Sequence, residues 1–97
     1  MDTIELEQKQ VDELNMKDQF QELIIELRNG GSMAAFVADL NCEAQPVSVA
    51  SGWMWQSGPQ LPGLLTLYNL MRYGATERAR EFGRRGLAIY GLRLVEG

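Results

Sequence analysis

The segment 56–63 places two prolines, Pro59 and Pro62, and two glycines, Gly58 and Gly63, within eight residues. Proline fixes its own φ angle and biases the preceding residue toward extended backbone. Glycine allows backbone angles that other residues resist. A helix or a central strand cannot run through such a segment, so we expect an exposed loop over 56–63.

The composition predicts one globular domain spanning 1–97. A chain of 97 residues is long enough to bury roughly 60–65% of its unfolded surface. Apolar residues make up 45% of the sequence, which is typical of a chain with a hydrophobic core and not of a disordered one.

Histidine is absent from the chain, and Cys42 is its single cysteine. Without histidine the chain lacks the commonest general base and metal ligand, and every Ser-His or Cys-His nucleophile pair. A lone cysteine forms neither an internal disulfide nor a thiolate metal site, so we expect Cys42 to be a small buried hydrophobe. The sequence predicts a protein that is not an enzyme and needs no metal or cofactor.

Neither the N-terminal residues nor the longest apolar stretch has the character of a targeting or membrane-spanning segment. The first residues lack a basic region followed by an apolar run. The stretch 61–71 is interrupted by Pro62 and Gly63 and is too short to span a bilayer. We expect a soluble, cytoplasmic protein with no membrane contact.

Helical periodicity is clearest in the first third of the chain. Asp2 and Glu5 fit a capping box, and the Asn-Gly-Gly sequence at 29–31 suits a helix end. Between them, apolar residues recur at i, i+3, i+4 and i+7. We expect 2–29 to form one long amphipathic helix or two collinear helices. The segment that contains it, 1–29, is acidic. The apolar stripe consists of Phe20, Leu23, Ile24 and Leu27.

Three shorter helices are expected further along the chain. Ser32 and Thr76 are suitable N-caps for helices over 33–40 and 77–85. A third helix is expected over 64–72. Its apolar face is expected to consist of Leu64, Leu67, Tyr68 and Met71.

Two segments remain ambiguous. The residues around 47–56 alternate in a way that predicts a short β-hairpin, with an irregular excursion as the other option. The segment 87–95 either continues the last helix or forms a strand, because Gly83, Gly86 and Gly91 each cost a helix about 1 kcal/mol relative to alanine. The expected fold is a mainly α single domain of about four helices, with an α+β fold as the alternative.

The charges are distributed unevenly. Residues 1–29 carry eight acids against three bases, whereas residues 72–97 carry six arginines against three glutamates. This asymmetry, with a basic C-terminal segment at 76–97, predicts either pairing between the two ends or two partner surfaces. Glu77 and Glu81 lie among the arginines, which argues against direct nucleic-acid binding. The candidate partner contacts in this segment are Arg78, Arg80, Arg84 and Arg85.

Trp53 and Trp55 alternate with Met54 immediately before the loop. In an extended backbone the two indoles would share one face, with Met54 on the other. Tryptophan fills cores and also dominates interface hot spots, so both roles stay open. We therefore include Trp53 and Trp55 with the four arginines as candidate contacts to a main partner.

The sequence Ser-Gly-Pro-Gln-Leu-Pro-Gly at 57–63 is similar to the exposed loop through which the HIV capsid protein binds cyclophilin. Both run small residue, Gly, Pro, two residues, Pro, Gly. The resemblance implies that Pro59 enters the proline pocket of a cyclophilin-type prolyl isomerase, and that Gly58 allows close backbone approach and the required torsion. The isomerase-binding residues that it implies are Gly58, Pro59, Gln60, Leu61 and Pro62.

A small histidine-free chain with such a loop resembles the anti-RecBCD proteins of P22-type phages. The resemblance implies a phage-encoded protein in the host cytoplasm that binds the RecC subunit of the RecBCD helicase-nuclease. It also implies recruitment of a host cyclophilin-type isomerase, and a modulated nuclease that favours phage recombination. Three other classes stay open: another anti-defence inhibitor of the anti-CRISPR kind, a nucleic-acid-binding regulator, and a self-associating structural protein.

Overall fold

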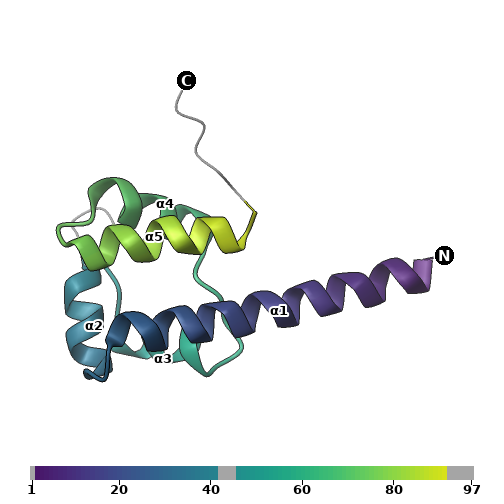
Figure 1. Cartoon of the computed structure of the whole chain (residues 1–97), viewed down its shortest axis with the longest axis horizontal. Coiled ribbons are helices and arrows are strands. Elements are labelled where there is room, and N and C mark those ends of the chain that lie inside the picture. The colour runs from purple at the N-terminus through teal and green to yellow at the C-terminus, as the bar shows by residue number, and fades with distance from the viewer. Residues whose placement is uncertain (1, 42–45, 92–97) are drawn as a thin grey trace.

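The computed structural model describes residues 2–41 and 46–91, and of residues 2–14 it describes the helical backbone alone. Every regular element in these ranges is a helix, so the mainly α prediction is confirmed. Cys42 lies outside the described residues. The helices are α1 (Asp2–Arg28), α2 (Met33–Leu40), α3 (Val49–Gln56), α4 (Leu64–Tyr73) and α5 (Glu77–Ile89) (Figure 1).

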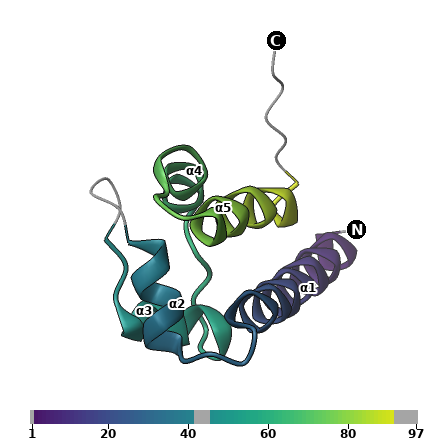
Figure 2. The same ribbon diagram turned by 60° about the vertical axis from the view of Figure 1, so that its left-hand side comes forward.

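Helix α1 is a single continuous helix, and its N-terminal part lies outside the packed helices (Figures 1 and 2). Its 27 residues correspond to about 40 Å of helix. The C-terminal part of α1 contacts α2, α3 and α5, whereas α4 packs mainly against α5. The core therefore lies around the C-terminal half of α1.

The core is organised around the ring of Phe82 on α5, which is fully buried. This ring meets Phe36 of α2 edge-on at 5.6 Å and stacks on Trp55 of α3 at 5.9 Å between centroids. It also meets Phe20 of α1 edge-on at 6.4 Å. Aromatic pairs in these geometries add about 0.5–1.5 kcal/mol each beyond the apolar area that they bury. Phe82 thus joins four of the helices.

Helices α4 and α5 approach so closely that one position on α5 has room only for glycine. A Cβ atom at Gly83 would overlap the carbonyl oxygen of Leu67 and would lie 2.5 Å from the backbone nitrogen of Met71. The conflict is with backbone atoms, which cannot move aside as a flexible side chain can. Gly83 therefore sets the spacing of the two helices, although it is a poor helix former.

The segment around 47–56 is neither of the two expected alternatives, a β-hairpin or an irregular excursion, because residues 49–56 form the helix α3. Ser48 caps α3, because its side chain accepts a hydrogen bond of 3.1 Å from the Ser51 backbone N–H. Gly52 then lies against α2, where an added Cβ would sit 2.7 Å from the sulfur of Met33. The Ser48 cap is a local interaction, whereas the need for glycine at position 52 follows from packing against Met33, which is distant in sequence.

For the segment 87–95, a continued helix and a strand were the two alternatives. Helix α5 continues through Ile89, so a strand beginning at residue 87 is wrong. The chain turns after the helix at Gly91, whose φ of +81° favours glycine. The rest of the expected strand, residues 92–95, lies outside the described residues.

The buried face of α4 differs from the expected one. Leu67 and Leu70 are fully buried, whereas Leu64 and Tyr68 are 47% and 36% exposed. The reason is the contact with Gly83, which brings the Leu67–Met71 side of α4 onto α5. The expected apolar face, which included Leu64 and Tyr68, is therefore rotated around the helix axis relative to the observed contact face.

We predict that Gly83→Ala lowers the free energy of unfolding by about 1–3 kcal/mol, because the methyl group overpacks the α4–α5 contact. On an open helix surface the same change stabilises by about 1 kcal/mol, so the sign of the effect is diagnostic. Urea unfolding followed by tryptophan fluorescence measures it. Ala88→Gly, at an exposed position of α5, is the control and should lose only about 1 kcal/mol. A Gly83→Ala protein as stable as the wild type would contradict the close contact.

Candidate protein-interaction site

The expected loop begins one residue later than predicted, because Gln56 is the last residue of α3 and is buried. The backbone N–H groups of Ser57 and Gly58 donate to the carbonyl of Trp53 at 2.8 and 3.2 Å, which ends the helix. A Cβ at Gly58 would lie 2.9 Å from the Cα of Met54. The φ angle of Gly58 is not positive, so the backbone conformation does not require glycine there. Gly58 is therefore needed for packing on α3.

Lys17 of α1 fixes the start of this loop. Its ammonium donates to the carbonyl oxygens of Met54, Trp55 and Gln60 at 3.0, 2.6 and 3.1 Å. The first two belong to the last turn of α3, where carbonyls lack helical partners and the helix dipole favours a cation. Burial lowers the pKa of Lys17 from its ordinary value.

Tyr90, just after α5, fixes the end of the loop. Its hydroxyl donates to the carbonyl of Pro62 at 2.7 Å, and Pro62 itself is fully buried. Burial raises the pKa of the Tyr90 hydroxyl. Pro62 is thus an anchor inside the domain, although the resemblance had grouped it with the isomerase-binding residues.

The exposed part of the loop lies between the contacts of Lys17 and Tyr90. Pro59 and Gln60 are exposed, while Gly58 and Leu61 are half-buried. The peptide bond before Pro59 is trans, since the described residues contain no cis peptide bond. Of the five residues implied by the resemblance, the structure leaves Pro59 and Gln60 as the accessible pair.

The two tryptophans lie in different environments, and the expectation that they share a face was wrong. Trp55 is 7% exposed and stacks on Phe82 in the core. Trp53 is 44% exposed and lies under the guanidinium of Arg28, 5.0 Å from the ring centroid. Because α3 is a helix, residues two apart point about 200° from each other. Only Trp53 is available to a partner.

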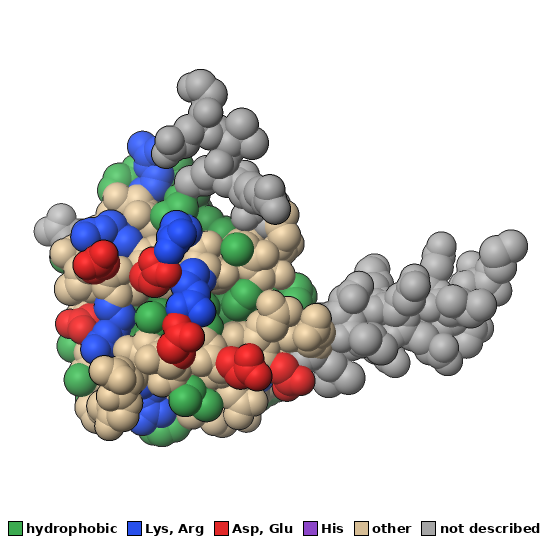
Figure 3. Space-filling view, viewed as in Figure 1, with side chains coloured by type: hydrophobic (Ala, Val, Ile, Leu, Met, Phe, Trp, Pro, Cys, Tyr) green, Lys and Arg blue, Asp and Glu red, His purple; other side chains and the backbone are tan. Residues whose placement is uncertain are grey.

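Each of the four candidate arginines contacts a group within the chain. Arg78 pairs with Asp39 at 3.1 Å, and Arg84 pairs with Glu81 at 2.5 Å in its own helix. Figure 3 shows the resulting surface, where positive and negative side chains alternate. The remaining contacts are those of Arg80 with the carbonyl of Gly74 at 2.9 Å and of Arg85 with Glu26 of α1.

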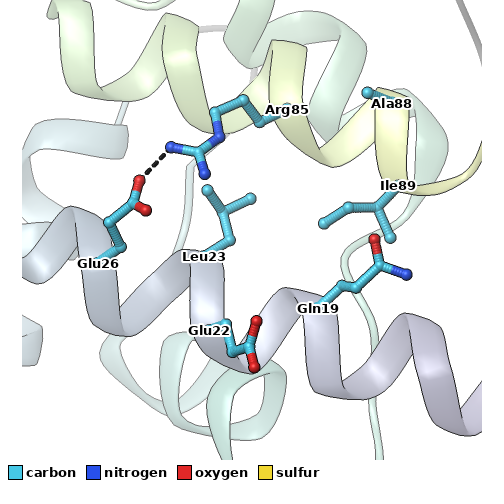
Figure 4. A pocket seen from close by; sticks show the side chains of 7 residues that line it. All are labelled: Gln19, Glu22, Leu23, Glu26, Arg85, Ala88 and Ile89. Carbon is cyan, nitrogen blue, oxygen red and sulfur yellow. Dashed lines mark hydrogen bonds and ion pairs between the residues drawn. The ribbon is translucent and has the colours of Figure 1, made fainter.

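The pair between Arg85 and Glu26 joins the basic segment to the acidic first helix. Arg85 donates a hydrogen bond to the Glu26 carboxylate. This bond and the charge of Arg85 lower the pKa of Glu26, and the same bond raises the pKa of Arg85. The pair lies at one end of a groove of about 350 Å³ between α1 and α5 (Figure 4). Leu23, Ala88 and Ile89 supply its apolar lining, with Gln19 and Glu22 also lining it.

The exposed apolar surface of α4 was not predicted from the sequence. Leu65 is 70% exposed, and Tyr73 is 57% exposed. Together with the exposed Leu64 and Tyr68 they cover one side of the helix, and the guanidinium of Arg72 lies 5.9 Å from the Tyr68 ring centroid. The Leu-Leu pair at 64–65 did not indicate this exposure, because adjacent helical residues can both be buried, as Leu23 and Ile24 are in α1.

No model of a protein family matches the chain, and neither does any curated protein or solved structure. None of the helices in the described ranges is long and apolar enough to cross a membrane. Within the same ranges, no group of three or more histidine, cysteine or acidic side chains is placed to hold a metal ion.

We predict that Tyr90 makes stability fall at alkaline pH. Its folded pKa is raised above the unfolded value of about 10, so its contribution is complete below pH 10 and is lost as the pH rises through the folded pKa. Tyr90→Phe should lose about 0.5–1.5 kcal/mol at pH 7, and this deficit should shrink above pH 10. Urea unfolding between pH 7 and 11 measures both.

Tyr73→Phe, which changes an exposed tyrosine, is the control for this prediction. Its unfolding free energy should follow the wild-type curve at every pH. A Tyr90→Phe deficit that stays constant from pH 7 to 11 would show that the hydroxyl does not titrate as described.

Proposed function

We propose that this chain is a docking protein that presents Pro59 to a cyclophilin-type prolyl isomerase. The observation that carries the proposal is the contrast between Pro59, which is exposed, and the chain on either side of it, which is anchored at Trp55, Gln60 and Pro62. An isomerase groove requires an accessible proline ring, and the ring of Pro59 is exposed. The seven-residue resemblance at 57–63 supports the same partner.

The proposed mode of action is stoichiometric binding without turnover. Exchange between trans and cis at an X-Pro bond is thermally accessible, at about 0.5–1 kcal/mol, but slow. An isomerase bound at Gly58-Pro59 therefore either catalyses this exchange or holds one form. In the first case the chain is a substrate of the isomerase and in the second case its ligand, and in neither case do its own side chains carry out chemistry.

For the main partner we propose the RecC subunit of the RecBCD helicase-nuclease, as the resemblance to anti-RecBCD proteins implies. The chain would act in the host cytoplasm and alter the nuclease so that phage recombination is favoured. The internal pairing of Arg78, Arg80, Arg84 and Arg85 supports a protein partner over nucleic acid, because DNA binding depends on cations that are free to neutralise phosphates.

Trp53 is the proposed contact of highest energetic weight on this main-partner surface. It is a large exposed aromatic with an arginine on its ring, and Trp and Arg are enriched in interface hot spots. A small domain that covers about 800 Å² of a larger enzyme has an interface of the size that stable complexes use.

Pro59→Ala should weaken binding of a purified cyclophilin-type isomerase at least about tenfold, because the proline ring would no longer fill the pocket. Isothermal calorimetry measures the affinity, and a ligand of the isomerase groove should compete with the wild type. Pro46→Ala, at an exposed proline elsewhere, is the matched control and should bind normally. Undiminished binding by Pro59→Ala would refute the loop's role.

Purified protein should co-elute with RecBCD and alter its exonuclease activity, with the effect saturating at a fixed stoichiometry. Trp53→Ala should weaken this binding by about 30-fold, equivalent to the 2 kcal/mol of a hot spot. Val49→Ala removes another exposed apolar side chain of α3 and serves as the control. Failure to co-elute, with nuclease activity unchanged, would exclude this partner.

A further inference from the structure

The ammonium of Lys17 joins two parts of the chain that meet at the displayed loop. Two of its acceptors, the carbonyls of Met54 and Trp55, end α3, and the third belongs to Gln60, directly after Pro59. An ammonium has three N–H donors, so each donor has one carbonyl. Both ends of the excursion that carries Pro59 are therefore tied to one charged atom.

The second tie comes from the opposite end of the sequence. The Tyr90 hydroxyl holds the Pro62 carbonyl, and the ring of Tyr90 packs 5.6 Å from Phe20 in the core. The loop is thus bonded to α1 at its start and to the end of α5 at its close. Both donors reach it across the fold, at sequence separations of 28 to 43 residues.

We propose that Lys17 and Tyr90 are positioning residues that hold the segment 57–62 in the conformation that its partner binds. Preorganisation raises affinity because the partner does not have to order the loop on binding. The choice of an isomerase as the partner rests on the proposed function above. The ordering of the loop by Lys17 and Tyr90 is independent of that proposed function.

These two residues also restrict what a partner can recognise. The carbonyls of Gln60 and Pro62 already accept hydrogen bonds inside the domain. The exposed side chains of the segment include the ring of Pro59 and the side chain of Gln60. The partner site that fits them is an apolar pocket of proline size with one polar group at its rim.

The first test measures order in the free protein. In the wild type, the backbone amides of Gly58, Gln60 and Leu61 should have order parameters near 0.8, and Lys17→Met should lower them below about 0.6 while the helices stay ordered. Methionine keeps the apolar stem and removes the three donors. Ser32→Ala removes the N-cap of α2, so it lowers stability without touching the loop and should leave these values unchanged.

Tyr90→Phe provides a second variant that keeps the ring and removes only the hydroxyl. It should lower the order parameter of Leu61 more than that of Gly58. Unchanged order parameters in both variants would overturn the proposal, and so would an equal loss of order in Ser32→Ala.

The second test compares binding of the domain with binding of a synthetic peptide of residues 56–63. The wild-type domain should bind a cyclophilin-type isomerase at least about tenfold more tightly than the peptide, and Lys17→Met should abolish most of that difference. A peptide that binds as tightly as the domain would overturn the positioning role. If neither binds, the proposed function is wrong, and the order parameters alone then decide whether Lys17 and Tyr90 position the loop.

Discussion

The packing of the Phe82 ring is the interaction on which the rest of the structure depends. Phe20, Phe36 and Trp55 bring α1, α2 and α3 onto α5 through this one side chain. One residue further, Gly83 brings α4 close from the other side. Phe82, which has a large side chain, and Gly83, which has none, thus hold the other four helices in place. Domains of this size bury a limited core, and most of them unfold in a single cooperative transition.

The displayed loop depends on that core indirectly. Trp55 stacks on Phe82 and so fixes the end of α3, whose last carbonyls bind Lys17. Tyr90 packs on Phe20 and reaches Pro62 from there. The two residues that order the loop are therefore themselves ordered by the aromatic cluster, and the exposure of Pro59 is a property of the whole domain.

The sequence was sufficient where the determining interactions are local. Ser32 and Thr76 cap helices through their own side chains, and the Asn-Gly-Gly sequence ends α1, so these boundaries could be predicted. It was insufficient for α3, whose Gly52 is explained only by the neighbouring Met33. The role of Lys17 was invisible as well, because its acceptors are backbone carbonyls, and every residue type carries one. The loop's position could be predicted, but the burial of Pro62 depends on a tyrosine 28 residues away.

The projecting end of α1 gives the molecule a built-in spacing. Lys17 marks the point on α1 where the loop is attached, and Asp2 begins the same helix fifteen residues earlier. At about 1.5 Å per residue, the far end lies about 22 Å from the attachment point, roughly two helix diameters. Because the backbone hydrogen bonds of the helix fix this length, the distance between the attachment point of the loop and the start of α1 stays constant as long as α1 remains helical.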